Sequence, residues 1–195
     1  MHNKLIIYVN LFGYWMRYFS LLIVSLFLLT SCGGEMPQAA KDSVVQSVDA
    51  NQYLGTWYEI ARLDHTFERG LEQVTANYSL EKDGSIKVIN KGYNTEKKVW
   101  KEAIGKAKFV DVANSDGTRT GRLKVSFFGP FYGAYNIIAL DKPSYSYALI
   151  SGGQEYLWIL SRTPQLAEPV KQELVEKAKT LGYATDKLIF VKQAS

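Results

Sequence analysis

Few side chains in this sequence have the chemistry of a catalyst or of a metal site. The 195 residues include one cysteine, Cys32, and two histidines, His2 and His65. A zinc or haem centre needs more ligands than these supply, and no Ser-His-Asp order or nucleophile elbow is present. Glu59 could act as an acid, although a buried, hydrogen-bonded carboxylate is the commoner role. The sequence therefore predicts no enzyme activity, no metal and no cofactor.

Cys32 is the one residue with a definite predicted modification. A largely apolar run, residues 18–29, follows Arg17 and ends at Leu29-Thr30-Ser31-Cys32. This order is typical of a secretory signal. Its last four residues resemble the bacterial lipobox, in which the cysteine becomes the first mature residue and carries acyl chains such as palmitate. A free or buried cysteine is the alternative, and a spanning helix extended back through Arg17 is a poor one.

The boundaries of the chain's parts follow from that motif. We expect a lipoprotein signal peptide over residues 1–31, with Met1 or Met16 as the start. Residues 32–50 would be the lipidated cysteine and a flexible tether, because 35–50 are small and polar. Residues 51–195 would form the folded domain. Gly33 after the cysteine, by resemblance to enterobacterial lipoprotein sorting, favours the outer membrane of a Gram-negative bacterium.

Composition narrows the class of partner. With 47% hydrophobic and 13% aromatic residues, the chain can bury a substantial core. The net charge is +4, and removing Lys4 and Arg17 with the leader leaves 21 basic and 19 acidic residues, a net charge of +2. A nucleic acid is therefore not an expected partner.

Alternation of apolar and polar residues with a period of two predicts antiparallel, half-buried strands. The segments are 55–64, 75–80, 86–91, 102–109, 122–127, 133–141, 145–152 and 155–161. The Asp83-Gly84 and Asp116-Gly117 pairs mark turns between them. Eight such strands form either a sandwich or a closed up-and-down barrel.

Helical spacing replaces this alternation near the end of the chain. Over residues 165–181, apolar side chains recur on one face and Gly182 marks the stop. We expect this helix to pack on the sheet, with a membrane-surface helix as the less favoured alternative. Residues 188–191 predict a final strand.

The inward set of side chains mixes bulky and very small residues. Tyr78 and Phe109 alternate with positions such as Ala107 and Gly105. Such a set fits a solid core or a pocket for a lipophilic molecule equally well. Hydroxyl, amide and indole groups would give a pocket its few polar points.

Three motifs resemble the lipocalin family. They are Gly55-Thr56-Trp57 at the first strand, Asp141 with Tyr145-Ser146-Tyr147-Ala148, and Ser161-Arg162-Thr163-Pro164 before the helix. Two further segments, 67–71 and 127–133, look like the bacterial outer-membrane lipocalins, whose eukaryotic kin resemble apolipoprotein D. The resemblance spans nearly all of 51–192.

The resemblance implies a fold, a function and a set of residues. The expected fold is all-β, an eight-stranded antiparallel up-and-down barrel with one C-terminal α-helix outside. Gly55, Trp57 and Arg162 would be structural, with the arginine stacked on the tryptophan to close the barrel. The implied function is binding, storage or transport of fatty acids or lysophospholipids for envelope maintenance. By position, the ligand-binding residues would be Tyr78, Val88, Asn90, Ala107, Phe109, Val125, Phe127, Tyr135, Tyr156 and Trp158.

Other partners and roles stay open. The alternative function is a structural envelope lipoprotein that acts through a protein partner and has no physiological ligand. The expected partners are a lipid and, through the acyl anchor, a membrane, with a homodimer left open. Arg69, Lys97, Lys98 and Arg119 are candidates for a ligand head group, although solvated loop charges are the commoner case.

Overall fold

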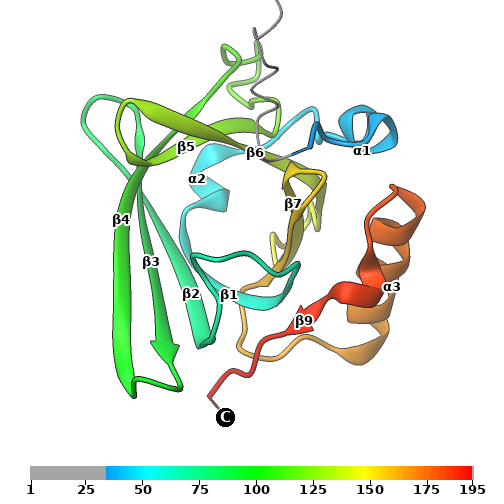
Figure 1. The fold of residues 1–195 in the computed structure, drawn as a ribbon. Coiled ribbons are helices and arrows are strands. Elements are labelled where there is room, and N and C mark those ends of the chain that lie inside the picture. Colours follow the sequence, from blue (N-terminus) through cyan, green and yellow to red (C-terminus); the bar gives the residue numbers. More distant parts are fainter. Residues whose placement is uncertain (1–33, 195) are drawn as a thin grey trace, which may run out of the picture. The chain divides into compact units, whose positions relative to one another are not determined.

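A computed structural model describes residues 34–194 and shows an antiparallel sheet with helices outside it (Figure 1). Residues 1–33 and 195 lie outside the described part, so the predicted signal peptide and Cys32 lie there too. The strands are β1 (Gly55–Arg62), β2 (Leu71–Leu80), β3 (Ile86–Asn94), β4 (Val99–Phe109), β5 (Arg122–Phe128), β6 (Phe131–Leu140), β7 (Tyr147–Gly153), β8 (Tyr156–Ser161) and β9 (Ile189–Phe190). The helices are α1 (Gln38–Asp42), α2 (Ala50–Tyr53), α3 (Glu168–Thr180) and the short 3-10 turn η1 (Thr185–Lys187).

The first eight strands close into a barrel. Each pairs with the next along the chain, and β1 pairs with β2 on one edge and with β8 on the other. This closure confirms the predicted up-and-down barrel and excludes the sandwich. The added strand β9 pairs with β1 at Ala61 and Arg62, beyond the residues where β1 meets β2.

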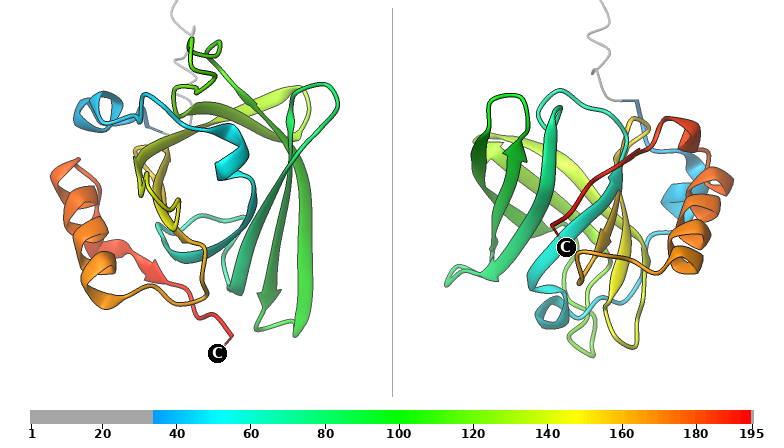
Figure 2. Two further views of the ribbon diagram at one scale, coloured as in Figure 1. Left: turned by 180° about the vertical axis from the view of Figure 1, so that it is seen from behind. Right: turned by 90° about the horizontal axis from the view of Figure 1, so that it is seen from below.

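Helix α3 packs on the outer face of the barrel (Figure 2, left). Its buried residues Leu174 and Ala178 join a core that includes Leu157 and Ile159 of β8. Gly182, with φ of +94°, follows its end and adopts a left-handed conformation that suits glycine. The packed position confirms the predicted helix and rules out the membrane-surface alternative, because the apolar stripe is already covered.

The segment before β1 differs from the prediction of a flexible tether over residues 32–50. From residue 34 on, this segment is packed against the barrel, and Ala40, Val44 and Val48 are buried. The Val48 N–H donates to the Arg119 carbonyl at 2.7 Å, and the Arg119 N–H donates back at 2.9 Å. The few apolar residues in a polar stretch were enough to seat it, which its composition did not reveal.

The two ends of the barrel are built differently. We call one end the floor, where α2 lies across the opening and residues 110–121 connect β4 to β5. We call the other end the mouth, which carries the connections 63–70, 95–98, 129–130 and 154–155. The right-hand view of Figure 2 shows the first two of these connections at one end and α2 at the other. Within residues 34–194, no helix is long and apolar enough to cross a membrane.

Candidate functional site: the barrel cavity

The barrel encloses a cavity of about 700 Å³ that reaches from the floor to the mouth. Tyr53 borders it at the floor, and Phe67 and Phe131 border it at the mouth. Most of its wall is apolar, as in pockets that hold lipophilic molecules. Small side chains on the inner face, such as Ala103 and Ala107 of β4, leave this volume free. The interior is therefore a pocket and not a solid core.

Nine of the ten predicted ligand-binding residues line this cavity. They are Tyr78, Val88, Asn90, Ala107, Val125, Phe127, Tyr135, Tyr156 and Trp158. The tenth, Phe109, is not among the lining residues. It packs against the core at the floor end of β4, with the Arg119 guanidinium 5.5 Å from its ring centre. Phe109 packs in the same core cluster as Val45 and Val48 of the segment before β1.

Three tyrosines place hydroxyl groups in the lower part of the cavity. The Tyr135 hydroxyl lies 2.6 Å from that of Tyr53 and 3.0 Å from that of Tyr78. Burial raises the pKa of Tyr78 to about 12, and it raises the pKa values of Tyr53 and Tyr135 as well. These phenols are neutral at ordinary pH and satisfy one another, so they add no charge to the lower cavity.

Asn90 is the exception among the polar residues of the wall. Its Oδ1 atom is buried and has no hydrogen-bond partner among the described residues. A buried acceptor without a partner is unfavourable. A hydroxyl or amide of a bound molecule, or a water, would satisfy it.

An arginine closes the floor. The Arg162 guanidinium lies 4.0 Å from the centre of the Trp57 ring. It donates hydrogen bonds to the carbonyls of Gln52, Thr56 and Tyr145, at 2.6, 3.0 and 3.2 Å. This is the contact that the resemblance implied. Gly55 has φ of +93°, and a Cβ atom there would lie 3.3 Å from Arg162 Nη1, so both geometry and space favour glycine.

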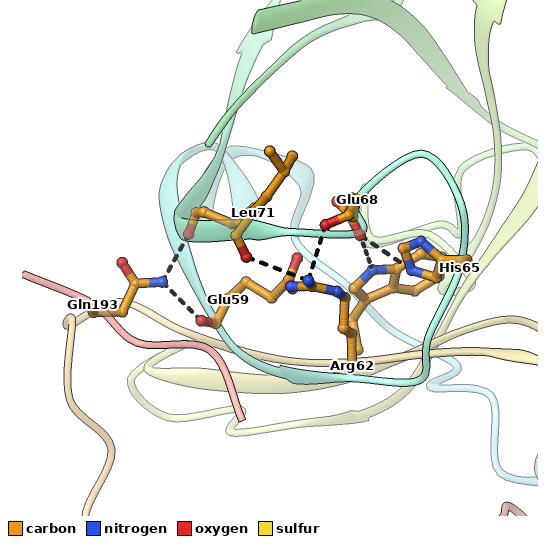
Figure 3. A network of polar contacts seen from close by, with 8 residues as sticks. Glu59, Arg62, His65, Glu68, Leu71 and Gln193 are labelled. Atoms are coloured by element: carbon orange, nitrogen blue, oxygen red, sulfur yellow. Dashed lines mark hydrogen bonds and ion pairs between the residues drawn. The ribbon is translucent and has the colours of Figure 1, made fainter. Parts of the chain in front are cut away.

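A second arginine is buried at the mouth, among two carboxyl groups (Figure 3). Arg62 Nη1 donates to Glu59 Oε1 at 2.6 Å, and Nη2 donates to the carbonyls of Glu68 and Leu71 at 2.9 and 3.3 Å. The Trp158 indole N–H donates to Glu68 Oε2 at 3.0 Å. Glu59 and Glu68 border the cavity, so this network forms a polar patch on a mostly apolar wall.

Burial controls the protonation of this network. It raises the pKa of Glu59 to about 8, with a smaller contribution from Glu68, and Arg62 opposes the shift. It also raises the pKa of Glu68. Burial, helped by Arg62, lowers the pKa of His65 to about 4, although His65 Nε2 lies 3.1 Å from Glu68 Oε2. At neutral pH the histidine is uncharged, and Glu59 holds a proton that an exposed carboxyl group would lose.

Sequence reasoning missed two residues of this network, Arg62 because of a β-bulge and Glu68 because it lies outside the strands. Glu59 faces Leu160 across the β1–β8 pair, and the register shifts before Ala61 faces Ile159. The extra residue, Ile60, turns Arg62 back to the cavity side of the sheet, opposite Trp158. Strict alternation would have placed Arg62 outside. Glu68 lies in a connection, where no periodicity applies.

The loop charges considered for a head group occupy different places. Arg69 pairs with Asp64 at the mouth, on the exposed side. Lys97 and Lys98 lie in the β3–β4 connection at the mouth and are exposed. Arg119 lies at the floor, where it donates to the Asp111 carbonyl, and so it stands at the other end of the barrel from the first three. Among residues 34–194, no group of three or more His, Cys, Asp or Glu side chains is arranged to hold a metal ion.

Comparison with known proteins identifies a family and several relatives that resemble this chain. The profile of the family described as "Lipocalin-like domain" matches residues 48–193. The Vibrio cholerae protein named outer membrane lipoprotein Blc is 51% identical over 173 residues, which cover 88% of this chain and 96% of that protein. The Escherichia coli protein of the same name is 52% identical over 168 residues, covering 86% and 91%.

More distant relatives share the fold. Apolipoprotein D of Rattus norvegicus is 36% identical over 132 residues, covering 63% of this chain and 65% of that protein. The crystal structure of apocrustacyanin C1 superposes with a TM-score of 0.63 at 18% identity, covering 84% of this chain and 91% of that one. At that identity, the likeness concerns the fold alone.

Proposed function

The chain belongs to the lipocalin-like family, and from that premise we propose that it binds lipids in the barrel cavity and stores or transports them. The observation that carries the proposal is the cavity of about 700 Å³, whose wall is apolar from Tyr53 at the floor to Phe131 at the mouth. Each methylene of an acyl chain buried there would contribute about 0.8 kcal/mol before the cost of ordering the chain.

Fatty acids and lysophospholipids are the ligand classes that best suit this wall. Each has one long apolar chain, which suits the apolar wall, and one polar end. At the floor end the wall carries the neutral hydroxyls of Tyr53, Tyr78 and Tyr135, so a charged end is unfavourable there. The polar end would remain near the mouth, where Glu59 and Glu68 line the wall. A single chain with its head group uppermost is the ligand we propose.

The proposed location is the outer membrane of a Gram-negative bacterium, with an acyl anchor on Cys32. The Leu29-Thr30-Ser31-Cys32 motif supports the anchor, and the names of the Vibrio cholerae and Escherichia coli relatives support the membrane. The proposed role is envelope maintenance, and it assigns no catalysis to the chain.

Native mass spectrometry of residues 33–195 with lysophospholipids and fatty acids tests the binding. We expect one lipid per chain. The variant Ala107→Phe fills the cavity at a lining position and should abolish the adduct. Lys108→Phe, on the neighbouring exposed position, is the matched control and should keep it.

One result of this experiment would contradict the proposal. A folded barrel that takes up no lipid would support instead a structural lipoprotein that acts through a protein partner. Thermal unfolding of both variants shows whether the barrel is intact.

A further inference from the structure

The mouth of the barrel carries a rim of exposed aromatic side chains. We call this set the aromatic rim, and it consists of Phe67, Trp100, Phe128, Phe131 and Tyr132. Phe128 and Phe131, beside the β5–β6 turn, are the most exposed, at 82% and 79%. Phe67, Phe128, Phe131 and Tyr132 also line the cavity, so the rim is continuous with its apolar wall. A soluble surface rarely gathers so many large apolar rings.

Lysine side chains accompany two of these rings. Lys91 Nζ lies 4.8 Å from the centre of the Trp100 ring, and Lys124 Nζ lies 5.4 Å from the centre of the Tyr132 ring. Aromatic rings with lysines that extend past them are typical of protein surfaces at a membrane interface, where rings enter the head-group region and ammonium groups reach phosphates.

The floor lacks such a rim. Its exposed large apolar residues are aliphatic, with Val112 the most exposed at 86%. They stand beside charged groups, such as Asp111 paired with Arg122. Among the described residues, the one further exposed aromatic ring is Phe190 on β9, on the outside of the barrel.

The described chain begins at the mouth. The Gln154 N–H, in the β7–β8 turn, donates to the Gly34 carbonyl at 2.9 Å. Tyr156, which follows that turn, lines the cavity. Cys32 precedes Gly34 by two residues, and two residues of extended chain span about 7 Å at most. A lipid attached to Cys32 would therefore hold the mouth, and not the floor, close to a bilayer.

We propose that the mouth is a membrane-docking surface, with the aromatic rim in the head-group region of the bilayer and the cavity opening directly onto the lipids. This inference rests on the proposed acyl anchor at Cys32. It adds to the proposed function an orientation of the barrel on the membrane and a route for the lipid. On this route, a lipid would pass between the bilayer and the cavity without crossing water. The partner surface is a phospholipid bilayer, and the rim and the anchor position support it independently.

A label at each end of the barrel tests the orientation. Because Cys32 is the chain's single cysteine and is blocked when acylated, a cysteine introduced elsewhere can be labelled selectively. A spin label at Phe131→Cys, at the mouth, is compared with one at Val112→Cys, at the floor. The acylated full chain is placed in vesicles of phosphatidylethanolamine and phosphatidylglycerol.

We expect the mouth label to be relaxed mainly by oxygen, which concentrates in the bilayer, and the floor label by a water-soluble nickel complex. Equal access of the nickel complex to both labels overturns the proposal. Strong spin–spin coupling between Phe131→Cys labels, without bilayer contact, overturns it in favour of a second copy of the chain covering the rim.

A kinetic test separates this inference from the proposed function. The variant Trp100→Ser, at the rim position that does not line the cavity, should slow lipid transfer from vesicles several-fold, while its affinity for monomeric lysophospholipid in solution stays unchanged. Val112→Ser is the control and should leave both unchanged. Unaltered transfer in Trp100→Ser overturns the docking proposal. Absence of lipid binding in the unaltered chain defeats the proposed function instead, and the label experiment still reports the orientation.

Discussion

Each end of the barrel depends on an arginine, and the two arginines are held in opposite ways. Arg162 at the floor is half-buried, stacks on Trp57 and donates only to backbone carbonyls. Arg62 at the mouth is 2% exposed and lies among Glu59, Glu68 and the uncharged His65. Carbonyls and an indole ring do not titrate, whereas carboxyl groups do. The floor is therefore a closure that is insensitive to pH, and the mouth is a closure whose charge can change.

The largest effect is expected from Arg62→Met. Removing this cation leaves Glu59, which ionises near pH 8, without its charged partner, and it leaves the carbonyls of Glu68 and Leu71 without their donor. Breaking such a buried network costs about 3–5 kcal/mol. We expect this loss in the free energy of unfolding, measured with urea at pH 8. At pH 5 Glu59 is protonated, and the loss should be smaller.

The double variant Glu59→Gln/Arg62→Met is the control, because it also removes a buried acid. It should recover part of the lost stability at pH 8. An equal loss at pH 5 and pH 8 would show that the mouth does not titrate and would remove the proposed difference between the two ends.

Arg162→Ala should have the next largest effect. It removes the contact with Trp57 and three hydrogen bonds to carbonyls, which together are worth about 2–3 kcal/mol at a half-buried site. The loss should be the same at pH 5 and pH 8, because no partner titrates. Arg162→Lys keeps the charge but not the planar fork, so it should recover only a small part.

The two ends of the barrel also differ in how much of their structure could be predicted from the sequence. The floor was predictable because Trp57 and Arg162 belong to motifs of fixed spacing. The cavity wall was predictable because strand alternation places Val88 or Val125 on one face. The mouth network was not, because the bulge at Ile60 moves Arg62 to the other face. The packing of residues 38–53 depends on long-range contacts, such as that of Val48 with Arg119, which local composition does not show.

The pH dependence of stability distinguishes the ends more finely. Unfolded Glu59 loses its proton near 4.5, and folded Glu59 keeps it to about 8. Its raised pKa therefore favours the folded state fully below pH 4.5, and this contribution is lost as pH rises to about 8. His65 acts in the opposite direction, because its pKa falls from 6.5 to about 4. Its contribution is present above pH 6.5 and is lost as pH falls toward 4.

We therefore expect the free energy of unfolding to decline between pH 6.5 and pH 8, where the contribution of Glu59 is being lost and that of His65 no longer changes. The slope for Glu59 is at most about 1.4 kcal/mol per pH unit. Glu59→Gln should flatten this decline. In the floor variant Arg162→Ala, by contrast, the pH profile of stability should stay parallel to that of the unaltered protein. A rise in stability over the same interval in the unaltered chain would contradict the assignment.

The smallest effect is expected from an arginine pair that lies beside the buried one but faces water. Arg69 Nε donates to both carboxylate oxygens of Asp64 at 3.1 and 3.2 Å, and both side chains are exposed. Arg62 and Glu59 make a contact of the same chemical type at 2.6 Å, with both side chains almost fully buried. Water screens the outer pair, so Asp64→Asn should leave the urea midpoint within experimental error, and added salt should not change that result. A clear loss of stability in Asp64→Asn would mean that the outer pair helps to hold the 63–70 connection over the cavity, and the strength of the mouth would then no longer depend on burial alone.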